Sequence, residues 1–121
     1  PESTEIRGRS LVSGLPKTIT ITADEMFEAF EEPALQIVDA VKAVLEQTPP
    51  ELVGDISEKG IVMTGGGSLI WGIDRLISYE TGIHCEVADN PISCVAIGTG
   101  KSFDMLDVLM ESKTRNKYKI Q

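Results

Sequence analysis

The segment Gly60-Ile61-Val62-Met63-Thr64-Gly65-Gly66-Gly67-Ser68 decides the fold class of this chain. Its run from Ile61 to Thr64 has no charged interruption, which is typical of a buried parallel strand. A helix is predicted after the glycines, from about Leu69 to Thr81, with Gly82 as its C-cap. A strand, a glycine turn and a helix in this order indicate an α/β fold.

The sequence downstream continues the same pattern. Apolar Ile83, Cys85 and Val87 alternate with His84 and Glu86, a period of two that predicts a strand. Asp89-Asn90-Pro91 predicts a turn, and a last helix is expected from about Ile92 to Met110. The alternating order of strands and helices favours a parallel pairing of the two strands.

The sequence upstream predicts a β-hairpin and three helices. Residues 4–22 are expected to form two strands around the turn Ser13-Gly14-Leu15-Pro16. Thr22 and Glu25 predict a capping box at the start of a helix that ends near Glu31, and Pro33 predicts the start of a second helix. Thr48 is the predicted N-cap of a third, short helix that ends near Gly60. The apolar stripe of the second helix comprises Ala34, Ile37, Val38, Val41, Val44 and Leu45.

Composition excludes several classes of protein. The 121 residues are 41% hydrophobic and 25% charged, which favours one globular domain at most and argues against disorder. A net charge of −8 argues against general nucleic-acid binding. The two cysteines are too few for a disulfide framework and favour a reduced cytosolic protein. Because the chain begins at Pro1 without Met, we expect a piece of a longer protein.

The glycine turn is the first candidate for chemistry. Gly65, Gly66 and Gly67 would let a ligand approach the backbone closely, and the following helix would offer unpaired amides. Tight turns from strand to helix often need glycine as well, so the residues alone leave both interpretations open. A second glycine segment, Gly98 to Ser102, is not a P-loop, because Val95 stands where that motif requires glycine. Gly98 and Gly100 inside a predicted helix instead suggest that another backbone or a ligand lies close to the face from Ala96 to Gly100.

Other chemistry is weakly supported. His84 and the two cysteines lack the spacing of a zinc site, and no catalytic triad or acid/base pair is evident. Trp71 is expected to be packed or partly exposed beside the glycine turn. Residues 24–58 hold ten acidic residues against the single base Lys42, which indicates solvated helix faces or an acidic docking surface. We therefore predict no catalytic residue and no metal ligand in this chain.

Several segments taken together resemble the C-terminal third of the MreB family, the bacterial actin-like rod-shape proteins that include Mbl. The similarity runs in order through about residues 5–108. The segments that carry it are Arg7-Gly8-Arg9, Gly14-Leu15-Pro16-Lys17-Thr18, Ile37-Val38-Asp39-Ala40-Val41-Lys42, Thr48-Pro49-Pro50-Glu51-Leu52, Gly60 to Gly67, Glu80-Thr81-Gly82-Ile83, and Asn90 to Gly100.

This resemblance implies a fold and its divisions. The expected fold is a partial actin-like (ribonuclease H-like) ATPase lobe, helix-rich α/β, with a short N-terminal β-hairpin. Residues 1–32 would be the end of the small subdomain of the second lobe, and residues 33–110 the later part of its large subdomain. Residues 111–121 form a basic tail for which the family suggests no counterpart.

The resemblance also implies which residues form a site. The glycine turn would contact the adenosine of the nucleotide through Gly65, Gly66, Gly67, Ser68 and Leu69. Val95, Ala96, Gly98 and Gly100 would lie on a helix that faces the interdomain hinge. ATP with Mg would bind the full-length parent, a slow ATPase, whereas this chain alone is expected neither to hydrolyse ATP nor to bind it tightly.

The implied function is that of a filament-forming cytoskeletal protein that directs cell-wall synthesis and rod cell shape. Its expected partners are further copies of itself and membrane cell-shape proteins of the RodZ type, with no nucleic acid and no direct membrane insertion by this segment. We expect a cytoplasmic protein that reaches the membrane through other parts of the parent. The alternatives are a fragment of another actin-fold ATPase, such as a sugar kinase or chaperone, and a free-standing interaction module that uses residues 24–58.

Overall fold

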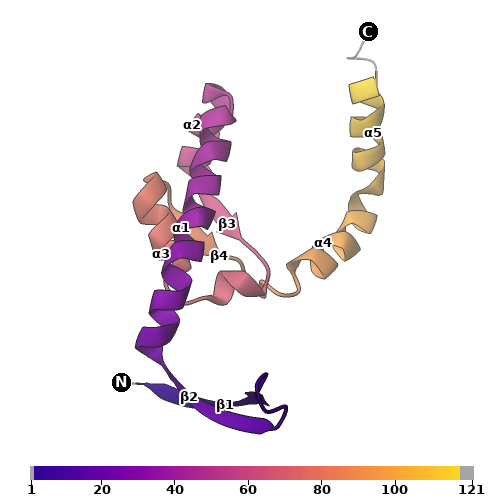
Figure 1. Cartoon of the computed structure of the whole chain (residues 1–121). Helices are drawn as coiled ribbons and strands as arrows, with labels where there is room; N and C mark the ends of the chain where they lie inside the picture. The colour runs from indigo at the N-terminus through magenta and orange to yellow at the C-terminus, as the bar shows by residue number, and fades with distance from the viewer. Residues whose placement is uncertain (1, 118–121) are drawn as a thin grey trace. The chain divides into compact units, whose positions relative to one another are not determined.

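The computed structural model describes residues 2–117, with side chains described through residue 114. The chain, which Figure 1 colours by residue number, divides into two compact units, Pro1–Pro50 and Glu51–Gln121. The first unit therefore includes residues 1–32 together with residues 33–50. The end of the predicted basic tail, residues 118–121, lies outside the described residues.

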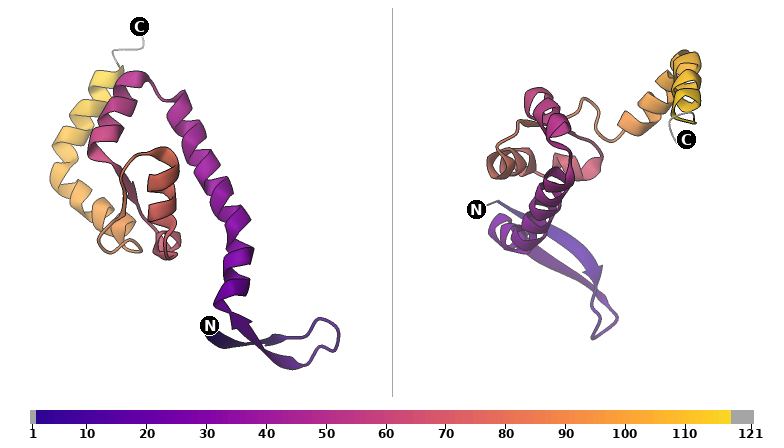
Figure 2. Two further views of the ribbon diagram at one scale, coloured as in Figure 1. Left: turned by 90° about the vertical axis from the view of Figure 1, so that its left-hand side faces the viewer. Right: turned by 90° about the horizontal axis from the view of Figure 1, so that it is seen from above.

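The first unit begins with the predicted β-hairpin. Strands β1 (Ser3–Arg9) and β2 (Pro16–Thr22) pair antiparallel, from Ser3 opposite Thr22 to Arg9 opposite Pro16. Gly14 adopts a φ of 72° in the connecting turn, and its amide donates to the Ser10 carbonyl over 2.8 Å. Figure 2 shows β2 leading directly into the long helix α1. The hairpin prediction is confirmed.

Helix α1 (Ala23–Gln47) begins as predicted but does not stop at Pro33. The Thr22 hydroxyl accepts the Glu25 amide over 3.2 Å, and the Glu25 carboxylate accepts the Thr22 amide over 2.9 Å, which confirms the capping box. The prediction of two helices was wrong, because Pro33 lies inside one continuous helix. Proline removes only one backbone hydrogen bond, and the surrounding turns of a 25-residue helix retain theirs. Of the predicted apolar stripe, Val38 is buried, whereas Ile37 and Val44 are exposed.

Helix α2 (Pro50–Lys59) starts later than its predicted cap. Thr48 instead ends α1, because its hydroxyl donates to the Val44 carbonyl over 2.6 Å and its amide donates to the Leu45 carbonyl. The helix starts at Pro50, where a missing N–H group has no cost. Its predicted end is confirmed, since Gly60 adopts a φ of 86° and its amide donates to the Ile56 carbonyl.

The second unit contains the predicted parallel pair of strands. Strands β3 (Ile61–Met63) and β4 (Cys85–Val87) pair with Ile61 opposite Cys85. The predicted alternation is confirmed, since Ile83 and Cys85 are buried whereas His84 and Glu86 are exposed. The expectation that β3 is buried throughout was wrong, because this two-stranded sheet leaves the Val62 side chain 56% exposed.

Helix α3 (Ile73–Thr81) is shorter than predicted and contacts β4. The residues from Gly66 to Leu69 form a separate 3-10 turn, η1, and Gly72 then adopts a left-handed φ of 82° that interrupts the helical path. Leu69, which was expected to face inward, is therefore exposed, whereas Ile73 and Ile77 are buried as predicted. Gly82 is the predicted left-handed C-cap.

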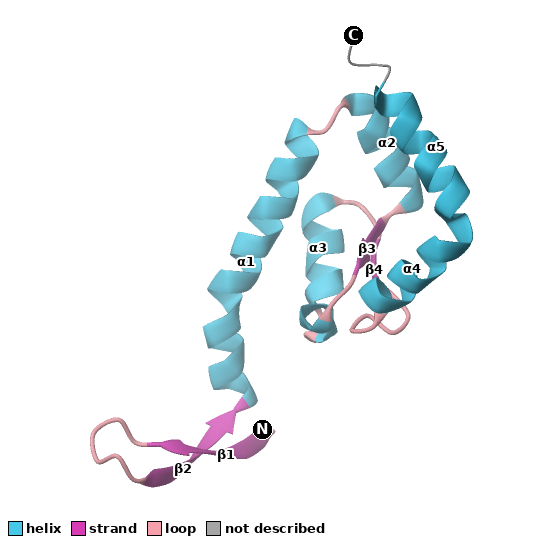
Figure 3. Cartoon of the chain, turned by 90° about the vertical axis from the view of Figure 1, so that its right-hand side faces the viewer, coloured by secondary structure: helices cyan, strands magenta, loops and turns pink. Residues whose placement is uncertain are grey.

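The last predicted helix is divided in two. Helix α4 (Cys94–Ser102) leads through a 3-10 turn, η2 (Phe103–Met105), into α5 (Leu106–Lys117), as Figure 3 shows in cyan. The prediction of one helix from Ile92 to Met110 was therefore wrong in its start, in its continuity and in its end, since α5 continues to Lys117. A 3-10 turn winds more tightly than an α-helix, so it shifts the faces of the two helices relative to each other.

Candidate functional site

The glycine turn lies at the edge of the sheet where both strands end. Because β3 and β4 are parallel, their carboxyl ends meet at one edge, and the Ala88 amide donates to the Met63 carbonyl there over 3.0 Å. The turn that starts at Thr64 and the loop that starts at Ala88 leave the sheet side by side. Open parallel sheets bind ligands outside the carboxyl ends of their strands. The predicted nucleotide-contacting residues thus lie where this class of sheet forms its sites.

Gly65 has a structural reason to be glycine. Its backbone adopts φ 82° and ψ 167°, a combination open in practice only to glycine. Its amide donates to the Pro91 carbonyl over 2.7 Å, which joins the turn after β3 to the loop after β4. The half-buried Gly65 therefore anchors the turn.

Gly66 and Gly67 have no such reason within the described residues. Both are exposed, and neither is among the glycines with positive φ. A Cβ atom built on either residue would meet no heavy atom within 4 Å. A Cβ atom would therefore fit at both positions, so no described part of this chain explains why they are glycine. Their contact with a nucleotide stays a prediction.

Ser68 and Leu69 complete the predicted site in different ways. The Ser68 side chain is buried, and its hydroxyl donates to the Gly65 carbonyl over 2.6 Å. That hydroxyl is therefore used inside the turn, and it stiffens the backbone around Gly66 and Gly67. The Leu69 side chain is 57% exposed and offers an apolar surface next to the glycines.

Trp71 follows the turn and is far more exposed than expected. Its side chain is 90% exposed, so the expectation of packing or partial exposure was wrong. The Arg75 guanidinium carbon lies 6.0 Å from the centroid of the Trp71 ring, at the outer limit of a cation–π contact. Gly72, the left-handed N-cap of α3, lies between Trp71 and Ile73, the first buried residue of that helix.

The predicted hinge-facing residues lie on α4 and are all exposed: Val95, Ala96, Gly98 and Gly100. A Cβ atom on Gly98 or Gly100 would meet no atom within 4 Å, so no described part of this chain makes the predicted close approach to that face. The small side chains on this helix thus have no explanation inside residues 2–117. Their role toward a hinge stays a prediction.

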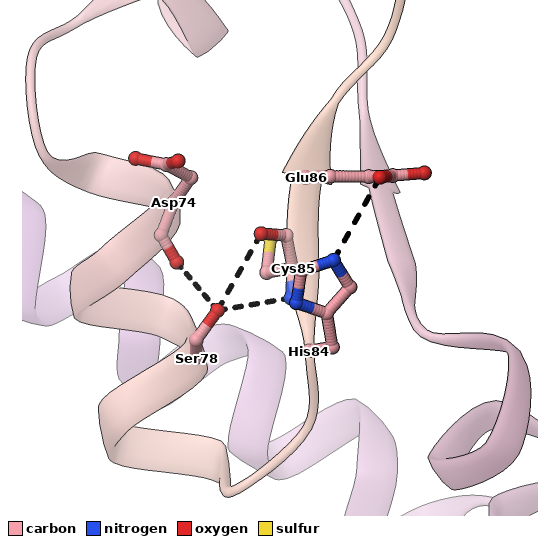
Figure 4. A network of polar contacts seen from close by, with 5 residues as sticks. All are labelled: Asp74, Ser78, His84, Cys85 and Glu86. Atoms are coloured by element: carbon pink, nitrogen blue, oxygen red, sulfur yellow. Dashed lines mark hydrogen bonds and ion pairs between the residues drawn. The ribbon is translucent and has the colours of Figure 1, made fainter.

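A polar network beside β4 was missed by the sequence analysis (Figure 4). Ser78 of α3 accepts the Cys85 amide over 2.9 Å and donates to the Asp74 carbonyl over 2.8 Å. Burial raises the pKa of the Cys85 thiol, and the nearby charges of Asp74 and Glu86 raise it further. A serine inside a helix carries no pattern that would have predicted this contact.

His84 is exposed, as expected for an ordinary strand residue. Its Nε2 atom lies 3.7 Å from the Glu86 carboxylate, with both side chains largely in solvent. Among the described residues, no group of three or more His, Cys, Asp or Glu side chains is arranged to hold a metal ion. Within the same part of the chain, no helix combines the length and the apolar character needed to cross a bilayer.

Comparison with known proteins assigns the family. Residues 1–111 match the family described as MreB/Mbl protein. The chain belongs to the MreB/Mbl family. Its sequence is 51% identical over 104 residues to the cell shape-determining protein MreB of Escherichia coli K12, covering 86% of this chain and 30% of that protein. It is 50% identical over 112 residues to the cell shape-determining protein Mbl of Bacillus subtilis, covering 93% of this chain and 34% of that protein.

Solved MreB structures share the fold. MreB5 of Spiroplasma citri bound to ADP matches with a TM-score of 0.78 and 36% identity, over 91% of this chain and 33% of that chain. The same protein bound to AMPPNP also matches with a TM-score of 0.78, over 93% of this chain. The expected family and the expected fold class, a partial actin-like lobe, are confirmed. This MreB/Mbl chain spans about a third of the length of the relatives it matches.

Proposed function

We propose that this chain is part of an ATP-binding, filament-forming protein that directs cell-wall synthesis and rod cell shape. Its relatives in Escherichia coli and Bacillus subtilis are described as cell shape-determining proteins. Because the chain spans only about a third of those relatives, nucleotide hydrolysis and filament formation are proposed for the longer protein and not for this segment.

We assign the adenosine contact to residues 65–69. The observation that carries this assignment is that Gly66 and Gly67 lie exposed in the turn at the carboxyl ends of β3 and β4, with no positive φ and no heavy atom within 4 Å of an added Cβ. A flat purine can lie against exposed glycine backbone, where any side chain would hold it away. Leu69 supplies an apolar contact, and Ser68 holds the turn in shape through its bond to Gly65. The relative MreB5 is bound to ADP in one structure and to AMPPNP in another, which supports a nucleotide as the ligand.

This segment provides only the adenosine side of the site. Tight ATP binding depends on charge-assisted hydrogen bonds to the phosphates, and none of the residues assigned here carries a positive charge. We therefore propose that Mg and the triphosphate are held by other parts of the protein. Isothermal titration of ATP into the 121-residue chain should show no binding at micromolar concentrations, and micromolar affinity would contradict this division.

The adenosine assignment is tested in a nucleotide-binding host. Residues 1–111 replace the matching third of Spiroplasma citri MreB5, and ADP affinity is measured by titration. Gly66→Val should weaken ADP binding at least about tenfold, because the new side chain fills the space proposed for the purine. Gly54→Val is the matched control, since Gly54 also has no atom within 4 Å of an added Cβ and lies away from the turn on α2.

The ADP affinities of the two variants decide whether the turn contacts the nucleotide. Loss of affinity in Gly66→Val with unchanged affinity in Gly54→Val supports the assignment. Equal affinity in Gly66→Val and the unmodified host would show that the turn does not face the nucleotide. Because neither position has a crowded Cβ, thermal unfolding of the 121-residue chain should change little in Gly66→Val.

Partners follow from the proposed function. We propose self-association into filaments, contact with membrane cell-shape proteins of the RodZ type, and a cytoplasmic location with membrane attachment through other parts of the protein.

We also propose that the small residues Val95, Ala96, Gly98 and Gly100 face the interdomain hinge. In the same MreB5 host, Gly98→Val should reduce the protein that pellets with ATP, and unchanged pelleting would contradict the hinge assignment.

A further inference from the structure

The loop that supports the glycine turn contains an unusual backbone. Asn90 adopts a φ of 49°, and it is the only residue other than glycine with a positive φ among residues 2–117. Left-handed backbone is unfavourable for residues with a Cβ atom, and asparagine tolerates it better than most. A residue that precedes proline normally adopts an extended backbone with negative φ, so Asn90 departs from that preference too.

Hydrogen bonds from Ser93 and Cys94 to the carbonyl groups of Asp89 and Asn90 hold this conformation. The Ser93 amide donates to the Asn90 carbonyl over 2.9 Å, and the Cys94 thiol lies 3.4 Å from the carbonyl oxygens of both Asp89 and Asn90. The next residue, Pro91, accepts the Gly65 amide over 2.7 Å. The left-handed residue is thus adjacent to the carbonyl that anchors the glycine turn.

This arrangement links a backbone angle to the shape of the proposed site. The φ angle of Asn90 sets the direction in which the chain enters Pro91, and therefore where the Pro91 carbonyl points. A change of Asn90 to negative φ would turn that carbonyl away and leave the Gly65 amide without its partner. The turn through Gly66 and Gly67 would then lose its link to the loop after β4.

We propose that Asn90 is a positioning residue for the nucleotide-contacting turn. Its left-handed backbone directs the Pro91 carbonyl to the Gly65 amide, and this bond presents Gly66 and Gly67 toward the nucleotide. The proposal rests on the proposed function, because it explains how the adenosine contact is held in place. Asn90 itself does not need to touch the nucleotide.

The first test measures the anchoring bond in the 121-residue chain. Amide hydrogen exchange is followed by NMR in wild type, Asn90→Ala and Asn90→Gly. The Gly65 amide should exchange about tenfold faster in Asn90→Ala, because alanine disfavours a positive φ, and at the wild-type rate in Asn90→Gly. The Ile61 amide, bonded to the His84 carbonyl, and the Cys85 amide, bonded to Ser78, serve as internal references and should not change.

The reference amides keep the test valid if the fold is weakened. Faster exchange at all three amides would indicate global destabilisation, and the comparison would then be made with Asn90→Asp, since aspartate also tolerates the left-handed region. The Gly65 amide should keep wild-type exchange in Asn90→Asp. A Gly65 amide that exchanges equally in wild type, Asn90→Ala and Asn90→Gly would overturn the proposal.

The second test measures ADP affinity in the MreB5 host that carries residues 1–111. Asn90→Ala should weaken ADP binding about tenfold, and Asn90→Gly should restore it, a rescue that loss of an asparagine contact would not give. Unchanged affinity in Asn90→Ala, while Gly66→Val loses affinity, would overturn the positioning role and leave the proposed function intact. Unchanged affinity in both variants would instead show that the proposed adenosine contact is wrong.

Discussion

The Ser78 hydroxyl lies 2.9 Å from the Cys85 amide nitrogen and accepts its hydrogen bond. On its other side β4 bonds to β3, where the His84 carbonyl accepts the Ile61 amide. A helix side chain therefore takes the place of a neighbouring strand along part of β4 (Figure 4). This contact fixes α3 to the sheet and covers an edge that would otherwise be open to pairing.

Loss of this hydroxyl should destabilise the chain. In Ser78→Ala the buried Cys85 amide has no partner, which is expected to lower the free energy of unfolding by about 1–3 kcal/mol. Ser57→Ala is the control, because Ser57 is exposed on α2 and should change stability little. Urea unfolding of both variants checks the prediction, and equal midpoints would show that water replaces the serine at no cost.

Replacing Gly60 and Gly54 by alanine should change the stability of the chain in opposite directions. A Cβ atom on Gly60 would lie 2.9 Å from the His84 carbonyl oxygen, and its φ of 86° is unfavourable for alanine. Gly60→Ala should therefore destabilise the chain by more than about 1 kcal/mol. Gly54 lies inside α2 with open space around it, so Gly54→Ala should stabilise by about 0.5–1 kcal/mol. Thermal unfolding measures both, and changes of the same sign would contradict the structure.

The first turn of α1 should become less stable at acidic pH. The pKa of Glu25 lies below its ordinary value of 4.5, first because its carboxylate accepts the Thr22 amide and second because it accepts the Thr22 hydroxyl. Its stabilising contribution is thus fully present above pH 4.5 and is lost as the pH falls through the lower value of the folded chain. Exchange of the Thr22 amide should accelerate over that range relative to amides in the middle of α1.

Glu25→Gln is the variant that isolates this effect. Glutamine keeps an oxygen that can accept the Thr22 amide but does not titrate, so the acid-dependent change at Thr22 should disappear. Glu28→Gln, on the same exposed helix, should leave the change as in wild type. If both variants retained the acid-dependent change, some group other than Glu25 would be responsible.

The two cysteines should react at different rates. Cys85 is buried, and burial together with Asp74 and Glu86 raises the pKa of its thiol above the ordinary 9.0, which keeps it protonated and unreactive at neutral pH. Cys94 is only half-buried and should be labelled by a thiol reagent at least about tenfold faster. In Cys94→Ser the fast phase should vanish, and a fast phase that persisted would contradict the burial of Cys85.

Because the pKa of Cys85 is raised in the folded chain, the chain should lose stability at alkaline pH. The folded chain binds the thiol proton more tightly than the unfolded chain does, so this contribution to stability is complete below pH 9.0 and is lost as the pH rises through the folded value. Urea midpoints should fall less steeply at alkaline pH in Cys85→Ala than in wild type. Parallel curves would show that another group causes the alkaline loss.

Local patterns predicted most elements because each depends on residues close in sequence. The capping box of Thr22 and Glu25 and the left-handed cap at Gly82 follow from chemistry within one helical turn, and both were confirmed. Pro33 and Gly72 were misjudged for a related reason. The long helix α1 continues through Pro33 although one backbone hydrogen bond is missing there. Gly72, in contrast, adopts a left-handed backbone, so α3 begins only after it.

The sequence alone determined the family, the order of strands and helices, and the glycine turn as the candidate site, since these depend on residue identity and local spacing. Only the tertiary structure decided which glycine serves the fold. Gly65 has a positive φ and donates its amide to the Pro91 carbonyl, whereas neither Gly66 nor Gly67 has a positive φ. It also revealed the contact between Ser78 and Cys85 and the left-handed backbone of Asn90, on which our proposal rests. These features arise between segments that are separate in sequence, and hydrogen bonds between such segments leave no periodic pattern from which they could be predicted.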